Sequence, residues 1–476
     1  MSAATPASSS GGRSGRPHVV VVGGGFAGIN AAHALRHSPV DVTLVDKHNY
    51  HTFQPLLYQV CTGYLPAEEV GAALRSVFRR QANLTVRVAL VTSVDWADRR
   101  LRLKNGSVLG FDHLVLAVGA QSNFFGIPGM AEHAWPLYTL GDAVRLRAHL
   151  LGTLECVAAT ERPTDAPITA VVVGGGPTGV ETAAALASMA HDVVGAIATL
   201  RVIIVEADSR LLNGFAPRSS RRALEHLRRS GVDVRLGRTV EAADSRGVTL
   251  DGGERIETGT VIWAAGVKAN GLGNTLALEL NRGRVAVDPH LQVVGHPNVY
   301  VAGDLAAVAA PQPGRLLPML APVAIQAGRH AGEQVAHVVA GEPLARFRYR
   351  DKGMMAVLGR GDAVAELPLL PGVGTAAYRL RFGGLPAWLL WACVHIVYLI
   401  CFRNRIKVLV DWGWSYFTSH GGGAISVHGC DDAQDLPSRA RDDPEVLAPP
   451  DGATRDTIPA STRMMSVAAL PRTIST

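Results

Sequence analysis

The sequence is poor in lysine and shows no basic block of the kind that nucleic acid requires. Only five of its 46 basic residues are lysine, so the net charge of +6 rests almost entirely on arginine, spread over 476 residues. We find no dense run of basic residues interleaved with aromatic ones, which argues against a nucleic-acid partner. A dispersed positive charge suits anionic cofactors or an anionic membrane surface instead.

Cysteine patterns and an apolar leader are also missing. The five cysteines, at positions 61, 156, 393, 401 and 430, form no CxxC pair. The seventeen histidines include no HExxH motif, and no metal site is predicted. Residues 1–16 are small and polar, are expected to be disordered, and lack the apolar core of a signal peptide. These absences predict a cytoplasmic catalytic body.

Internal repetition is the strongest signal that is present. Residues 20–35 (VVVGGGFAGINAAHAL) and residues 171–186 (VVVGGGPTGVETAAAL) are identical at ten of sixteen positions. In both copies an apolar β-branched run, typical of a buried strand, leads into a glycine loop and then into an alanine-rich segment typical of a helix. This strand–turn–helix context is what a dinucleotide-binding fingerprint requires. The sequence therefore predicts two nucleotide-binding units.

The first copy has the three glycines of a GxGxxG fingerprint, Gly23, Gly25 and Gly28. Their missing side chains allow a tight turn, a close approach of the backbone to a pyrophosphate, and close packing of the helix on the strand. The helix N-terminus offers N–H donors to the phosphates. Asp46 closes the next strand-like run, where its carboxylate can accept hydrogen bonds from a ribose.

The second copy has the same glycines, Gly174, Gly176 and Gly179. Glu206 closes its second strand, and an acidic residue there favours a free ribose 2′-hydroxyl, and hence NADH over NADPH. Arg210 nearby could weaken this exclusion of a 2′-phosphate. Glu181, just after the loop, has two interpretations: it orients the nicotinamide or donates a proton, or it is a first-turn carboxylate that complements the helix dipole.

The order of the segments predicts that one unit interrupts the other. Residues 165–290 form the second unit, which binds NADH. Residues 17–164 form the first, which resumes over 291–345 because residues 298–304 (NVYVAGD) resemble a short buried strand that presents an aspartate. The predicted fold class is α/β, with two Rossmann-like domains, the second inserted in the first, and a C-terminal membrane-attachment region at 346–417. Residues 418–476 are expected to be disordered.

The layout resembles the two-dinucleotide-binding-domain flavoproteins. Besides the fingerprints, the resemblance rests on residues 116–119 (LAVG), 263–266 (WAAG) and 299–304 (VYVAGD). In that superfamily the first unit binds FAD, and the aspartate of the last motif holds the ribityl chain. The resemblance therefore implies FAD contacts for Gly119, Gly303 and Asp304, and places Gly266 on the NADH side.

A narrower resemblance comes from residues 51–58 (HTFQPLLY), 347–353 (FRYRDKG) and 402–405 (FRNR), which are similar to motifs of the type II NADH:quinone oxidoreductases. It covers residues 17–417. In that family a peripheral membrane protein passes two electrons from NADH through FAD to a membrane quinone without pumping protons. The resemblance implies respiratory NADH oxidation at the cytoplasmic face of the cell membrane, and a homodimer built through the C-terminal segment.

The family's quinone motif, Ala-Gln-x-Ala-x-Gln, is altered in this chain. Residues 321–326 are APVAIQ, so Pro322 replaces the first glutamine and Gln326 keeps the second. Gln326 is the candidate quinone contact; a helix whose small residues admit a close neighbour is an interpretation that holds in either case. Lys352, in the Asp-Lys-Gly segment, is a candidate for approaching the flavin or quinone, with a solvated loop lysine as the alternative.

Residues 385–402 (LPAWLLWACVHIVYLICF) carry no formal charge. As one helix they would extend about 26 Å, slightly short of the roughly 30 Å hydrocarbon core. Arginines flank both ends and leave no charge asymmetry to orient a span. Residues 406–417 mix Lys407 with several aromatic residues, as an interfacial helix does. The sequence favours attachment to one membrane face, with a single span second and a buried core helix third.

Two other functions share parts of this pattern. A sulfide:quinone oxidoreductase or another dithiol flavoenzyme has the same two units but needs cysteines beside the flavin, and no cysteine lies between Cys156 and Cys393. A non-catalytic, nucleotide-sensing membrane adaptor would have kept the fold and lost turnover. Only Pro322 favours that last alternative.

Overall fold

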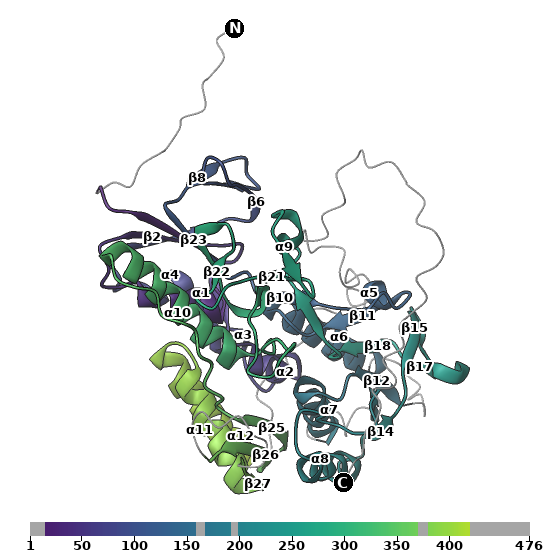
Figure 1. Ribbon diagram of the computed structural model, residues 1–476. Coiled ribbons are helices and arrows are strands. Elements are labelled where there is room, and N and C mark those ends of the chain that lie inside the picture. The colour runs from purple at the N-terminus through teal and green to yellow at the C-terminus, as the bar shows by residue number, and fades with distance from the viewer. Residues whose placement is uncertain (1–14, 159–166, 192–198, 370–378, 419–476) are drawn as a thin grey trace, which may run out of the picture.

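The computed structural model describes residues 15–158, 167–191, 199–369 and 379–418, and the statements below refer to those residues. The disorder expected for residues 1–16 and 418–476 falls outside them, apart from residues 15, 16 and 418. The α/β class expected from the sequence is confirmed by two separate, mainly parallel sheets with helices packed on them (Figure 1).

The first sheet is built around four consecutive buried valines. They belong to β1 (His18–Val22), which lies between parallel strands β2 (Asp41–Asp46) and β9 (His113–Leu116). A strand with neighbours on both sides and helices on its faces has no exposed position for a polar side chain. The sheet order is β22-β23-β9-β1-β2-β5. Its other strands are β5 (Leu84–Val88), β22 (Gln292–Val293) and β23 (His296–Val301).

The second sheet repeats this arrangement with strands taken from the middle of the chain. Its five parallel strands have the order β11-β18-β12-β13-β14. They are β11 (Ala134–Pro136), β12 (Ile168–Val173), β13 (Leu200–Glu206), β14 (Asp233–Leu236) and β18 (Thr260–Trp263). The strand β23 that follows them pairs with β9, so the chain returns to the first sheet. The short β11 joins the second sheet although it precedes residue 165.

Smaller elements complete the two units. Each unit also contains a three-stranded antiparallel sheet. In the first, β6 (Val91–Asp95), β7 (Arg100–Leu103) and β8 (Val108–Gly110) precede β9; in the second, β15 (Val240–Asp244), β16 (Gly247–Leu250) and β17 (Arg255–Glu257) precede β18. The helices between them include α2 (Leu57–Cys61), α3 (Ala67–Val70), α6 (Leu140–Ala158), α7 (Pro177–Met189) and α8 (Pro217–Arg229).

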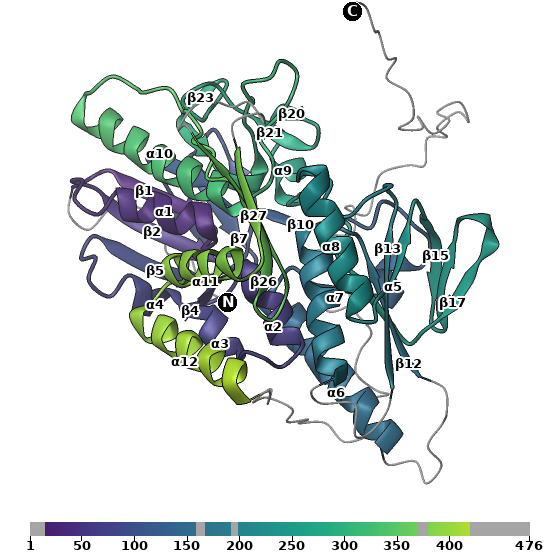
Figure 2. The same cartoon turned by 90° about the horizontal axis from the view of Figure 1, so that it is seen from below.

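Two helices of the first unit approach each other unusually closely. In α10 (Ala321–Ala340), a Cβ on Gly328 would lie 2.0 Å from the carbonyl oxygen of Ala27 in α1 (Phe26–Ala34). Figure 2 shows the two helices side by side. The contact confirms that the small residues of α10 serve close packing. Pro322 lies in the first turn of α10, where its backbone nitrogen would have no helical acceptor in any case.

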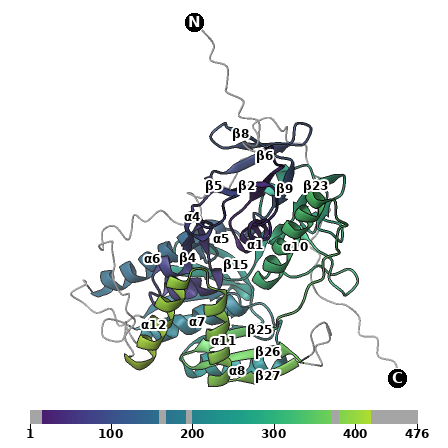
Figure 3. The same ribbon diagram turned by 90° about the vertical axis from the view of Figure 1, so that its left-hand side faces the viewer.

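The C-terminal region is a small sheet followed by two helices. The sheet consists of β25 (Met354–Gly359), β26 (Asp362–Pro368) and β27 (Arg379–Gly383), all antiparallel. Figure 3 shows it beside α8, with α11 (Leu385–Tyr398) and α12 (Phe402–Thr418) next to it. In the described part of the chain, no helix combines the length and the apolar character that a membrane crossing requires.

The single helix envisaged for residues 385–402 is wrong, because α11 ends at Tyr398. The Arg405 side chain donates from Nε to the Leu399 carbonyl oxygen at 2.8 Å and from Nη2 to that of Val397 at 2.7 Å. It thereby satisfies carbonyl groups at the end of the helix, which would otherwise lack partners. Cys401, with φ of +77°, turns the chain into α12.

Buried polar contacts fasten this C-terminal region to both units. The carboxylate of Glu366 in β26 is 2% exposed and accepts from Ser219 Oγ and the Ala216 amide, each at 2.7 Å, at the start of α8. Asn404 in α12 donates from Nδ2 to the carbonyl oxygens of Glu68, Glu69 and Gly71, each at 3.1 Å. One contact holds the second unit and the other holds the first, so the region bridges the two.

The substitution Gly328→Ala is expected to lower the Tm. Its methyl group would collide with the Ala27 carbonyl and force α1 and α10 apart, and such overpacking costs about 1–3 kcal/mol. Gly413→Ala is the matched control, because a Cβ there meets no described atom within 4 Å and alanine favours a helix over glycine by about 0.5–1 kcal/mol. Thermal unfolding measures both; equal shifts would contradict the importance of the α1–α10 contact.

Candidate functional site

The first glycine loop has the geometry that the fingerprint predicts. Gly23 has φ of +105°, and a Cβ there would lie 2.3 Å from the Ala117 carbonyl oxygen. A Cβ on Gly28 would lie 1.7 Å from the Gly23 carbonyl oxygen, so α1 crosses the loop at a distance that only glycine permits. A Cβ on Gly25 would meet no described atom within 4 Å. The open space therefore lies at the N-terminus of α1.

The second loop has nearly the same backbone angles and close contacts as the first. Gly174 has φ of +110°, and a Cβ on Gly179 would lie 1.8 Å from the Gly174 carbonyl oxygen. Gly176 again faces open space at a helix N-terminus, that of α7. Neither α1 nor α7 has an acidic residue in its first turn to repel a phosphate. The geometry at both loops fits an anionic dinucleotide.

The carboxylates predicted to bind ribose close β2 and β13, the strands that follow the loop helices α1 and α7. Asp46 accepts from the Gly24 amide at 2.5 Å and from the His48 amide at 2.6 Å. Glu206 accepts from the Gly175 amide and, at 2.7 Å, from that of Asp208. Each acid thus ties Gly24 or Gly175, the residue after the first fingerprint glycine, to the strand end where a ribose would lie. Burial raises the pKa of Asp46, and these N–H donors oppose the rise.

The Arg210 side chain is bound to Asn213. Its guanidinium donates from Nη2 to the Asn213 carbonyl oxygen at 2.7 Å and from Nε to Asn213 Oδ1 at 3.2 Å. Its effect on the preference for NADH stays a prediction.

Asp304 and Gly303 lie where β23 ends. Gly303 has φ of +75°, and a Cβ on it would be 3.0 Å from Ala27 Cβ, so the turn fits closely against α1. Burial raises the pKa of Asp304 to about 6, with the Arg284 charge opposing the rise. Arg284 is buried, and its Nε and Nη2 have no hydrogen-bond partner among the described residues. This buried cation, which the sequence argument missed, also fits an anionic cofactor.

Three further residues of the predicted motifs lie near the loops. Gly119 and Gly266 have φ of +73° and +155°, and their missing side chains face Tyr138 Oη and the Phe125 ring. His51 is buried, with Nδ1 3.0 Å from the Gly24 carbonyl oxygen and Nε2 without a partner among the described residues. Burial lowers the pKa of His51 to about 4, so the imidazole is neutral at pH 7.

A pocket of about 110 Å³ lies where the C-terminal region meets both units. Elements α2, α7, β25, α11 and α12 surround it. A relay of hydrogen bonds runs along its wall: Trp412 Nε1 donates to Gln59 Oε1 at 2.8 Å, and Gln59 Nε2 donates to Tyr58 Oη at 2.9 Å. The lining also includes Arg360, and five of its thirteen residues are aromatic: Tyr58, Tyr64, Trp388, Trp391 and Trp412.

Glu181 is the ionisable group of this pocket that sequence analysis selected. Its side chain is buried, and its Oε1 accepts from the Val357 amide of β25 at 3.1 Å. Burial raises the pKa of Glu181 to about 8, with the Val357 amide opposing the rise, so the carboxyl group is mostly protonated at pH 7. The alternative that Glu181 is a first-turn carboxylate is wrong, because the first turn of α7 contains no acid.

Gln326 and Lys352 do not line the pocket. Gln326 donates from Nε2 to the Arg350 carbonyl oxygen and accepts at Oε1 from the Arg350 amide, both at 3.0 Å. Its amide group thus pairs with the backbone as a neighbouring strand would, and holds the segment before β25 against α10. Lys352 lies exposed on the same segment. Their roles at a quinone or flavin stay predictions.

The thiols offer little support for a dithiol mechanism. Cys61 in α2 is buried, and its Sγ donates to the Tyr58 carbonyl oxygen at 3.2 Å. Burial raises the pKa of Cys61 to about 12, which leaves almost no reactive thiolate at pH 7. Cys393 and Cys401 lie in or beside α11, and both are free.

Comparison with known proteins identifies the family. The model of the pyridine nucleotide-disulphide oxidoreductase family matches residues 17–328. The chain is 40% identical over 427 residues to the type II NADH:quinone oxidoreductase NdhA of Mycobacterium tuberculosis, over 84% of this chain and 87% of that one. It is 35% identical over 430 residues to Ndh of the same organism, over 86% and 89%. The structure of NDH2 from Plasmodium falciparum in complex with NADH has a similar fold, with a TM-score of 0.76 and 21% identity over 86% of this chain and 100% of that one.

We expect Glu181→Gln to change the pH dependence of stability. The folded state keeps Glu181 protonated up to about pH 8, whereas the unfolded chain releases that proton near its ordinary value of 4.5. Stability contributed by the protonated group is complete below that ordinary value and is lost as the pH rises toward 8. Relative to Glu181→Gln, the free energy of unfolding of the wild type should fall by on the order of 3 kcal/mol between about pH 5.5 and pH 8. Denaturant unfolding at several pH values measures this difference. If the free energies of unfolding of the two proteins changed with pH in parallel, Glu181 would be ionised in the folded state.

Proposed function

This chain belongs to the type II NADH:quinone oxidoreductases, and we propose that its two glycine loops and aromatic pocket divide that reaction among three sites. It is an FAD-dependent enzyme that transfers two electrons from NADH to a quinone without proton pumping. The assignment of sites rests mainly on the two dinucleotide loops, which have nearly the same geometry. The C-terminal region that adjoins the pocket is also bound to both units.

FAD is assigned to the first unit. The open N-terminus of α1 at Gly25 would receive the pyrophosphate, Asp46 a ribose and Asp304 the ribityl chain. Arg284 would add a buried positive charge. Gly23, Gly28, Gly119 and Gly303 shape the space. When bound, the flavin supplies an acceptor for the hydride of NADH and a donor of electrons to the quinone.

NADH is assigned to the second unit. Gly176 leaves the N-terminus of α7 open to the pyrophosphate, and Glu206 is placed to accept a hydrogen bond from the free ribose 2′-hydroxyl. Gly174 and Gly179 set the loop, while Gly266 begins the return toward the first unit. We also propose that the second unit is an insertion in the first, which is supported by the pairing of β23 with β9.

The aromatic pocket is the proposed quinone site. Tryptophan and tyrosine rings provide flat apolar surfaces for a quinone ring, and α11 and α12 lead from the pocket to the surface. Oε1 of Glu181 accepts a hydrogen bond from the Val357 amide, so we place the carboxyl proton of Glu181 on Oε2. From Oε2 the proton can pass to a quinone oxygen during reduction. Gln326 acts as a further quinone contact or, through Arg350, as a positioning residue.

The exposed faces of α11 and α12 are the proposed membrane attachment. Large apolar side chains project there into solvent, and Phe402 is 77% exposed. A cluster of this kind on a helix pair is typical of attachment to one membrane face. Its members include Leu385, Leu389, Val397, Phe402, Ile406, Leu409, Val410 and Trp414. We assign this attachment to the cytoplasmic face, and we propose a homodimer through the same C-terminal region.

Half-reaction kinetics test the function and the quinone site together. The purified protein should be yellow, NADH should bleach the flavin in stopped flow, and a water-soluble quinone should restore its colour. Trp412→Ala should raise the quinone KM by about tenfold or more, because it removes ring contact and the Gln59 hydrogen bond. Gln326→Ala should raise it about two- to tenfold, the scale of one neutral hydrogen bond. Both should leave flavin reduction by NADH unchanged.

Three outcomes of these measurements would contradict the assignments. Flavin that NADH does not reduce would favour the adaptor. Loss of turnover in Cys61→Ala, which removes only a buried thiol, would favour a dithiol enzyme. Slower flavin reduction in Gln326→Ala would move Gln326 to the nicotinamide side.

Charged substitutions test the membrane surface. Leu389→Glu combined with Phe402→Glu should weaken co-sedimentation with anionic vesicles at least about tenfold, since each fully buried side chain of this size contributes about 1.5–3 kcal/mol. Val294→Glu is the matched control, because Val294 is equally exposed but lies between β22 and β23. Equal loss of binding in both variants would exclude α11 and α12 as the attachment surface.

A further inference from the structure

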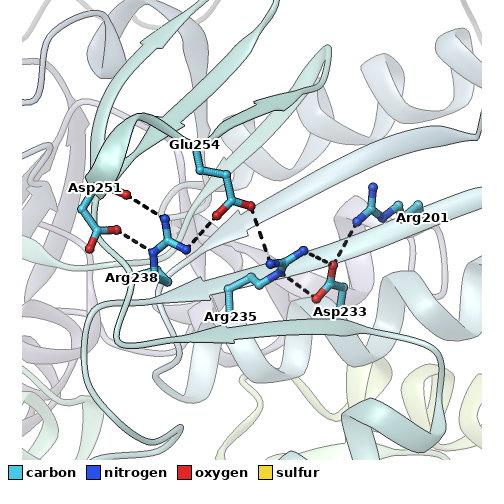
Figure 4. Close-up of polar contacts among 6 residues, drawn as sticks. All are labelled: Arg201, Asp233, Arg235, Arg238, Asp251 and Glu254. Atoms are coloured by element: carbon cyan, nitrogen blue, oxygen red, sulfur yellow. Dashed lines mark hydrogen bonds and ion pairs between the residues drawn. The ribbon is translucent and has the colours of Figure 1, made fainter.

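The strand next to Glu206 carries a chain of ion pairs that the proposed site does not use. Six side chains of alternating charge run along it, and we call them the arginine ladder (Figure 4). Three carboxylates face three guanidinium groups, so the ladder has no net charge. Its members in order are Arg201, Asp233, Arg235, Glu254, Arg238 and Asp251.

The ladder extends to the ribose end of the second unit. Strands β13 and β14 are parallel neighbours, with Glu206 opposite Leu236. Just beyond them, the Arg238 amide donates to the Glu206 carbonyl oxygen at 3.0 Å, and the Gly237 amide donates to that of Asp208 at 2.9 Å. The backbone therefore fixes Arg238 beside the residue proposed to hold the adenosine ribose.

The side chain of Arg238 is nevertheless bound to the hairpin of β16 and β17. Its Nε donates to Asp251 Oδ1 at 2.8 Å and its Nη2 to the Asp251 carbonyl oxygen at 2.7 Å. Its Nη1 donates to Glu254 Oε2 at 2.7 Å. All three guanidinium nitrogens are therefore engaged, although the side chain is 28% exposed. Glu254 also pairs with Arg235, at 3.6 Å.

Stability is a weak reason for such a network. Ion pairs between exposed side chains add little to the free energy of unfolding. Their position suggests a different consequence, since a guanidinium beside the ribose is the group that accommodates the 2′-phosphate of NADPH. In a chain with many arginines, a free one here would oppose the selection made by Glu206. Pairing neutralises its charge and engages one N–H donor on each of its three nitrogens.

We propose that Asp251 and Glu254 are specificity-determining residues, which hold Arg238 away from the ribose and so reinforce the preference for NADH. This inference rests on the proposed NADH site. Discrimination then has two components: Glu206 accepts the 2′-hydroxyl and repels a phosphate, and the two hairpin carboxylates keep a phosphate-binding cation occupied. Neither carboxylate needs to touch the nucleotide.

The test is the double variant Asp251→Asn with Glu254→Gln, which removes two charges while keeping the side-chain shapes. The amide oxygen introduced at position 251 can still accept from the Thr239 amide, as Asp251 Oδ1 does at 3.1 Å. We expect the ratio of kcat/KM for NADPH to that for NADH to rise about tenfold, the scale of a hydrogen bond to a charged group. Inhibition by 2′,5′-ADP relative to ADP, which requires no chemistry, should strengthen by a similar factor.

Three further variants identify the cause of the change. Adding Arg238→Ala to the double variant should abolish the gain, since Arg238 is the cation released. Asp244→Asn is the matched control, because it breaks the exposed pair with Arg255 on the same small sheet and should leave the ratio unchanged. If an amide at either position still holds Arg238, Asp251→Ala with Glu254→Ala removes the side-chain acceptors as well.

The outcomes separate this inference from the function on which it rests. An unchanged nucleotide ratio in both double variants, or a gain that survives Arg238→Ala, would overturn the role of Asp251 and Glu254. Failure of the wild-type protein to oxidise NADH would instead contradict the proposed function.

Discussion

Everything at the nucleotide ends of this molecule depends on the crossing of a helix over a glycine loop. At both loops the third glycine lies so close to the carbonyl oxygen of the first that a Cβ would be within 1.8 Å of it. Only this approach brings a helix N-terminus to the strand ends and leaves open space in front of the middle glycine. The acid at the end of the neighbouring strand then fixes the loop through a backbone amide. The shape of each proposed dinucleotide site thus depends on the missing side chains of its glycines.

The C-terminal region is bound to both nucleotide-binding units and fixes their proposed sites relative to one pocket. Glu366 binds the start of α8, and Asn404 binds the backbone around α3. Both are buried polar contacts, and such contacts are costly when only partly satisfied, so they fix the position of the region as well as its presence. The aromatic pocket exists only because of this docking, since its walls come from both units and from α11 and α12.

Burial also sets the chemistry of the groups around the pocket. Desolvation keeps Glu181 mostly protonated at pH 7 and raises the pKa of the Tyr58 phenol, so these two acidic groups add little negative charge to a wall that also includes Arg360. The protonated Glu181 and the five aromatic side chains of this wall suit the uncharged quinone that is proposed to bind there. In the arginine ladder of the second unit, by contrast, the charged side chains are partly exposed and paired with one another.

The sequence by itself determined the repeated loops, their glycines, the acids Asp46 and Glu206, and the family. These features are local: a strand, a turn and a helix within about thirty residues have a fixed geometry, whatever surrounds them. Only the tertiary structure decided that the apolar run ends at Tyr398, that Gln326 pairs with Arg350, and that Arg284 is buried beside Asp304. It also brought Tyr58, Glu181 and Trp412 to one pocket, although they lie far apart along the chain. Contacts between distant segments depend on how whole elements dock, and no spacing within one segment records that.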